Sequence, residues 1–210
     1  MNIPLKMYAA AFILSLPGLG RAADPARQAM GEGSRAYGKQ DYEKAAEAFE
    51  RAAQAAPAQK LDAAPASYNE ANALLKAGRA PEASIKYQDA LRAEDLNLQG
   101  RAFYNRGNAL YAVAEDNEQT NQLETAKQAI EESLHMYENA MTLAPGDEDA
   151  KVNYELALQK QKELEKKIEQ QKQQQQQQQN QQKQDQQKKD EQKQDQQKKE
   201  QEKKEQDQQK

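Results

Sequence analysis

The chain has no cysteine, no tryptophan and only one histidine among its 210 residues. Without cysteine it can form no disulfide bond and offers no thiolate for catalysis or metal binding. The single histidine, His135, is expected to be an ordinary surface or partly buried residue of a helix. Because the sequence also has no phosphate-binding glycine loop and no Ser-His-Asp spacing, we expect no enzymatic activity, no metal and no cofactor.

The chain also lacks an excess of positive charge and has one notable apolar run. A net charge of −4 argues against nucleic-acid binding, and no small-molecule substrate is indicated.

Residues 8–16 are apolar, Lys6 precedes them and Pro17 follows. With small residues at the −3 and −1 positions before a cut after Ala22, residues 1–22 are typical of a secretory signal. We expect a periplasmic or otherwise exported protein; the alternative is an uncleaved inner-membrane anchor.

One helical layout then recurs three times. Residues 104–111 read Tyr-Asn-Arg-Gly-Asn-Ala-Leu-Tyr, residues 68–75 align with them one by one, and residues 33–37 are a looser copy. A glycine inside a helix costs about 1 kcal/mol relative to alanine. Its presence at position 107 therefore suggests that another helix crosses closely there.

Each copy is followed by a second helical pattern, in which small, aromatic and small residues stand at i, i+4 and i+7 and share one helix face. These triplets are Ala45, Phe49, Ala52; Ala83, Tyr87, Ala90; and Ser133, Tyr137, Ala140. With proline after the second helix at Pro57 and Pro145, residues 28–157 resemble the tetratricopeptide repeat (TPR) family. The resemblance implies an all-α solenoid of helix-turn-helix repeats.

We expect repeats at about 26–57, 64–95 and 100–145, and a capping helix at 147–168. Asp41 is a candidate N-cap of a second helix. The third repeat is 14 residues longer between its helices than the others. With turn residues at 116–117 and 120–121, we interpret the insertion as an extended second helix that protrudes; a flexible loop is the alternative.

Residues 169–210 contain only Gln, Asn, Lys, Glu and Asp. Such a segment can bury no core and cannot fold as a domain. It also contains no helix breaker, and acid-to-lysine pairs four residues apart would support a helix weakly. We therefore predict a polar low-complexity tail that is either disordered or a solvated single helix. A coiled coil is not expected, because apolar a and d positions are missing.

In a TPR solenoid the first helix of each repeat lines a concave groove, and the resemblance places a partner-binding surface there. Asparagine amides can pair with an extended peptide backbone, although the same residues are also common repeat consensus. Met30 and Ser34 stand where the family's carboxylate clamp has Lys and Asn, which argues against terminal-carboxylate recognition. The predicted groove residues are Tyr37, Tyr68, Asn69, Asn72, Lys76, Arg101, Tyr104, Asn105, Asn108 and Asn153.

A closer resemblance concerns residues 104–111, residues 149–157 and the Gln-rich tail that follows. Together with the signal segment, they are similar to the TPR proteins of the bacterial aerotolerance (Bat) operon. That resemblance implies an envelope protein working beside membrane-anchored von Willebrand factor A domain proteins. We expect a non-catalytic adaptor that binds a protein or peptide partner; a structural spacer and a periplasmic chaperone are the alternatives.

Overall fold

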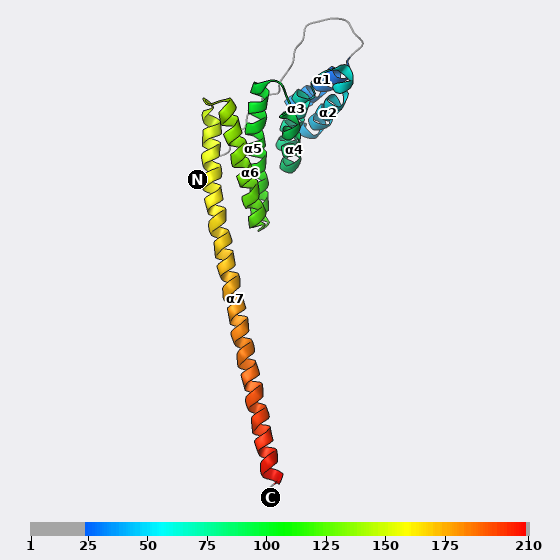
Figure 1. Ribbon diagram of the computed structural model, residues 1–210. Helices are drawn as coiled ribbons and strands as arrows, with labels where there is room; N and C mark the ends of the chain where they lie inside the picture. The colour runs from blue at the N-terminus through cyan, green and yellow to red at the C-terminus, as the bar shows by residue number, and fades with distance from the viewer. Residues whose placement is uncertain (1–23, 209–210) are drawn as a thin grey trace. The chain divides into compact units, whose positions relative to one another are not determined.

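A computed structural model describes residues 24–208, and every regular element in that range is helical (Figure 1). The predicted signal segment lies outside these residues. The elements are α1 (Pro25–Gly38), α2 (Tyr42–Ala55), the short 3-10 helix η1 (Pro57–Gln59), α3 (Ala64–Lys76), α4 (Ala80–Ala90), α5 (Leu96–Gln119), α6 (Leu123–Leu143) and α7 (Glu148–Gln208). The expected all-α class is confirmed.

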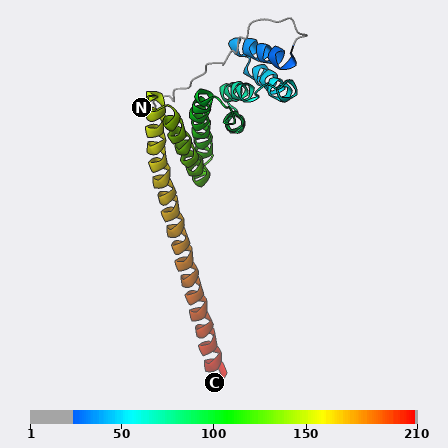
Figure 2. The same ribbon diagram turned by 45° about the horizontal axis from the view of Figure 1, so that its top comes forward.

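From α1 to α6, each helix packs on the helix before it and the helix after it. Figure 2 shows the same succession from a second direction. The helix-helix core is built mainly from alanines and a few rings, and Phe49, Tyr68 and Tyr87 are fully buried in it. The small residues on either side of each ring let neighbouring helices approach closely, so the small-aromatic-small pattern gives the spacing of the stack.

Glycines mark the closest approaches within the helix pairs. A Cβ built on Gly33 of α1 would lie 2.6 Å from the ring of Phe49 on α2, and Gly107 of α5 has the same relationship to α6. The close crossing predicted at Gly107 is therefore confirmed. Tight packing between the two helices of a repeat explains why a residue with poor helix propensity stands mid-helix.

Aspartates cap three of the helices. The Oδ1 atoms of Asp24, Asp95 and Asp147 accept hydrogen bonds from backbone N–H groups in the first turns of α1, α5 and α7. The predicted cap at Asp41 is different: it holds the N-cap position of α2, but its side chain makes no capping bond. Its carboxylate instead forms an ion pair with Lys44, with Oδ2 2.7 Å from Nζ. The carboxylate therefore has a partner other than the N–H groups of the helix.

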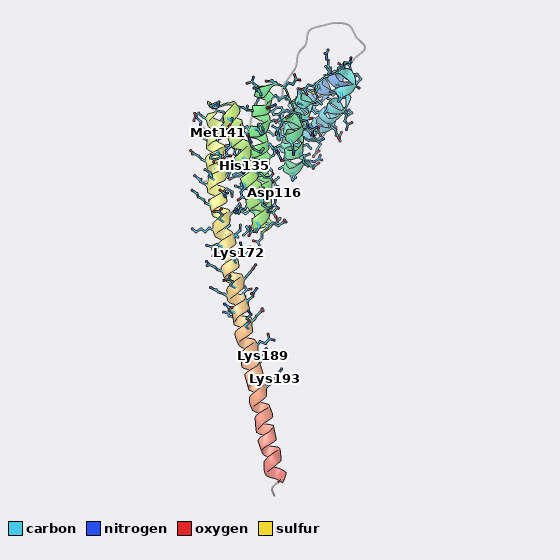
Figure 3. All side chains as sticks on the ribbon, viewed as in Figure 1. Asp116, His135, Met141, Lys172, Lys189 and Lys193 are labelled. Atoms are coloured by element: carbon cyan, nitrogen blue, oxygen red, sulfur yellow. The ribbon has the colours of Figure 1, made fainter. Side chains whose placement is uncertain are left out.

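The insertion in the third repeat is shared between its two helices. The turn falls at residues 120–122, so Asp116 lies inside α5, as Figure 3 shows, and α5 and α6 have 24 and 21 residues. The prediction that only the second helix is extended was therefore wrong. Ala114 of α5 and Ala126 and Ile130 of α6 are fully buried in this extension, so the added turns are packed on both helices and do not form a loop.

The chain forms two compact units, one ending at Glu165 and the other beginning at Lys166. In the first unit, α7 buries Ala150, Asn153, Ala157 and Leu164. The second unit is the continuation of α7 to Gln208, a single helix whose described side chains after Ile168 are nearly all exposed. The choice between a disordered tail and a solvated helix stays a prediction. No helix in residues 24–208 combines the length and apolar character needed to cross a membrane.

Candidate functional site: an asparagine-tyrosine row

Two repeats join their own helices through a tyrosine and an asparagine. The Tyr87 hydroxyl of α4 donates to Asn72 Oδ1 of α3 at 2.6 Å. At the equivalent positions of the next repeat, the Tyr137 hydroxyl of α6 donates to Asn108 Oδ1 of α5 at 2.8 Å. Burial raises the pKa of both phenols well above their ordinary value, so both remain protonated donors at neutral pH.

The same asparagines also connect one repeat to the next. Asn105 Nδ2 donates to the Tyr68 hydroxyl at 3.0 Å and to Asn72 Oδ1 at 3.2 Å. One junction further on, Asn153 Nδ2 of α7 donates to the Tyr104 hydroxyl and to Asn108 Oδ1, each at 2.9 Å. Two successive junctions therefore share one hydrogen-bond arrangement. In it, an asparagine amide donates to the tyrosine and to the asparagine on the first helix of the preceding repeat.

We call Tyr68, Asn69, Asn72, Tyr104, Asn105, Asn108 and Asn153 the Asn–Tyr row. All seven were predicted as groove residues, and all seven side chains are buried. Of the other three predicted residues, Tyr37 and Arg101 are half-buried and Lys76 is exposed. The hydrogen bonds within the row show that most of these residues hold the repeats together. They were predicted to line a groove, and this structural role is additional to that prediction.

The first repeat lacks this tyrosine-asparagine arrangement. By alignment on the glycines and aromatics, Met30, Ser34 and Phe49 occupy the positions of Tyr68, Asn72 and Tyr87. The Ser34 hydroxyl donates to the Met30 carbonyl of its own helix, at 2.9 Å. Sequence reasoning missed Tyr87 and Tyr137 as members of the network. The signal was present, since both carry a hydroxyl where the first repeat has phenylalanine.

Two polar groups, one in the row and one beside it, have no partner within the part of the chain that the structure describes. Asn72 Nδ2 is buried and donates no hydrogen bond, and neither does the Tyr37 hydroxyl. Burial raises the pKa of Tyr37 to about 12, so this hydroxyl also keeps its proton at neutral pH. A buried amide without an acceptor costs about 1–3 kcal/mol.

Near the start of α5, Arg101 lines a hollow of about 390 Å³ together with the exposed Leu96 and Leu143 and with Asp95 and Asp147. This hollow combines a guanidinium with two leucines and two aspartates. Among the described residues, no group of three or more His, Asp or Glu side chains could hold a metal ion. His135 lies on α6 (Figure 3), where it is exposed and its ring contacts Glu138.

Comparison with known proteins gives a structural match alone. No protein-family model matches the chain, and no curated protein matches it by sequence. Among solved structures, the first TPR of Spaghetti (RPAP3) bound to the HSP90 peptide SRMEEVD is similar, with a TM-score of 0.52 and 18% identity. The match covers 68% of this chain and 97% of that chain. Helix pairs in succession, small-aromatic-small packing and this structural neighbour together show that the chain has the tetratricopeptide repeat fold.

Proposed function

We propose that this chain is a non-catalytic adaptor whose first-helix face holds an extended segment of a partner polypeptide. The observation that carries the proposal is the tetratricopeptide repeat fold, which the chain shares with a solved TPR that is bound to a peptide. The similar TPR structure with a bound peptide supports this mode of use.

The half-buried and exposed members of the predicted groove define how the segment would be held. Tyr37 offers a rigid ring with a hydroxyl, and Arg101 and Lys76 offer positive charge. Met30 and Ser34 replace the clamp residues that would grip a terminal carboxylate. We therefore propose that an internal segment, rather than a chain terminus, is bound.

Site-specific photo-crosslinking tests this proposal. A photoreactive phenylalanine at position 37 or 101 should give a covalent adduct with one or a few partners in the producing cell. The matched control is the same residue at position 85, because Ile85 is 61% exposed on α4 and was never part of the predicted groove. Equal adducts at all three positions, or none, would refute a groove-bound partner.

We further propose that the partner is a protein of the bacterial envelope, in a Bat-type complex with membrane-anchored von Willebrand factor A domain proteins. The support is the sequence resemblance of residues 104–111 and 149–157 and the signal-like residues 1–22. Fractionation of the producing cell tests the location. Recovery of the chain in the cytoplasm, with Met1 retained, would contradict it.

The spacer and chaperone alternatives make different predictions in the same experiment. A spacer would give no specific adduct at position 37 or 101. A chaperone would give many adducts and would suppress aggregation of unrelated unfolded proteins. The adaptor requires a restricted set of adducts and no general suppression of aggregation.

A further inference from the structure

Each junction between successive repeats brings the same two positions together on the face away from the Asn–Tyr row. The first position directly follows a row asparagine, and the second directly follows a buried aromatic of the preceding repeat. The first positions are Glu70, Arg106 and Tyr154, and the second positions are Glu50, Gln88 and Glu138.

Two of the three junctions are bridged by a long side chain. Arg106 reaches from α5 to α4, where its guanidinium lies 3.4 Å from both Ser84 Oγ and Gln88 Oε1. At the following junction, the Tyr154 hydroxyl donates to Glu138 Oε1 at 3.1 Å. A hydrogen-bond donor from the later repeat thus meets an acceptor of the earlier repeat each time.

The first junction has no such bridge, because both of its positions are glutamates. A hollow of about 360 Å³ remains between α2, α3 and α4. The charged groups lining it are Glu50, Asp62, Glu70, Asp89, Lys86 and Arg92, four acidic and two basic. Lys86 pairs with Glu70 and Arg92 with Asp89, so the hollow keeps an excess of two negative charges, which favours an added cation.

Glu70 is the most deeply buried of these groups, with 4% of its surface exposed. Its Oε1 lies 2.8 Å from Lys86 Nζ, while its Oε2 is buried and accepts no hydrogen bond within residues 24–208. Burial raises the pKa of Glu70, and the neighbouring Glu50 and Asp89 raise it further against the opposing effect of Lys86. A second cationic donor at Oε2 would satisfy this carboxylate.

We propose that the hollow between α2, α3 and α4 binds the guanidinium of an arginine side chain supplied by a partner polypeptide. At the next junction, the guanidinium of Arg106 already lies against Gln88, which occupies the position equivalent to Glu50. A guanidinium has five N–H donors in a planar fork, which suits carboxylate oxygens better than a single point charge does. At about 100° per residue, Glu70 lies about 160° from Tyr68 and Asn72 and about 100° from Asn69 around α3, so it faces away from the hydrogen-bonded members of the Asn–Tyr row.

The test uses N-acetyl-arginine amide as the probe and the full, isotope-labelled chain. The backbone amide signals of Ser67, Glu70 and Asp89 should shift in a saturable way on titration. The neutral isostere N-acetyl-citrulline amide should leave them unchanged. Equal shifts with citrulline, shifts confined to other elements, or shifts produced by calcium ions but not by the arginine probe would overturn the proposal.

Two variants separate binding from folding. Glu70→Gln should weaken probe binding about tenfold, because it removes a buried charge-assisted hydrogen bond. Glu50→Gln alters an exposed side chain and reproduces the Gln88 of the next junction, so it should weaken binding without unfolding the chain. The matched control is Glu132→Gln, an exposed carboxylate on α6, which should bind the probe as the unmodified chain does. Unchanged binding in Glu50→Gln and Glu70→Gln would refute the site.

Discussion

Gly107 on α5 lies directly beneath the ring of Tyr137 on α6. A Cβ at Gly107 would stand 2.6 Å from Cε1 and 2.8 Å from Cδ1 of that ring, closer than carbon atoms can approach without movement. The ring is itself fixed, because its hydroxyl donates to Asn108 on the next residue of α5. The backbone of one helix and the aromatic ring of the other therefore form a single contact that sets the distance between them.

Gly107→Ala should destabilise the protein by about 1–3 kcal/mol, because the added methyl forces the ring or the helix to move. Alanine alone would favour the helix by about 1 kcal/mol. The matched control is Gly38→Ala, where an added Cβ would meet nothing within 4 Å. Urea unfolding of the two variants should therefore show opposite signs. A stable Gly107→Ala variant would contradict the close approach.

Tyr137→Phe should lower the free energy of unfolding by about 1 kcal/mol, since it removes one buried hydrogen bond while the ring still packs on Gly107. Asn108 would keep its bond from Asn153 Nδ2, so the row should persist. Tyr154→Phe is the comparison, because its hydroxyl bonds to Glu138 at the surface. We expect little change there in the same denaturant measurement.

The burial of Glu70 predicts the sign of a pH dependence. Its pKa is raised in the folded protein above the ordinary value of 4.5, so the folded state holds a proton that the unfolded state has released. Stability must then fall as pH rises from about 4.5 through the folded pKa. The difference in unfolding free energy between the unmodified chain and Glu70→Gln should decrease over that interval. A difference that grows with pH would mean that the Lys86 pairing outweighs burial.

Truncation after Ile168 should leave the melting temperature unchanged and reduce the hydrodynamic radius. The described side chains beyond that residue are nearly all exposed, so their removal takes away almost no buried area. Without tertiary packing, a helix depends on weak propensity and charge pairs. Hydrogen exchange should consequently be fast over residues 175–210. Strong protection there would reveal a packed, self-associating helix.

The sequence alone determined the helical periodicity, the small-aromatic-small packing faces and the close approach at Gly107. These follow from local spacing, because residues three, four and seven apart share one helix face. The polar composition of residues 169–210 likewise excluded a packed core without any structure.

Only the tertiary structure decided how the asparagines are used and where the insertion goes. Asn105 and Tyr68 are far apart in the chain, and their hydrogen bond depends on how one repeat stacks on the next. The sequence named both 116–117 and 120–121 as turn residues; the structure places the turn at 120–122, with 116–117 inside α5, where Ala114 is fully buried. The unfilled slot at Glu70 likewise becomes visible only when successive repeats are placed side by side. Local sequence fixes which face of a helix is apolar, while contacts between repeats depend on the distance and rotation of whole helices.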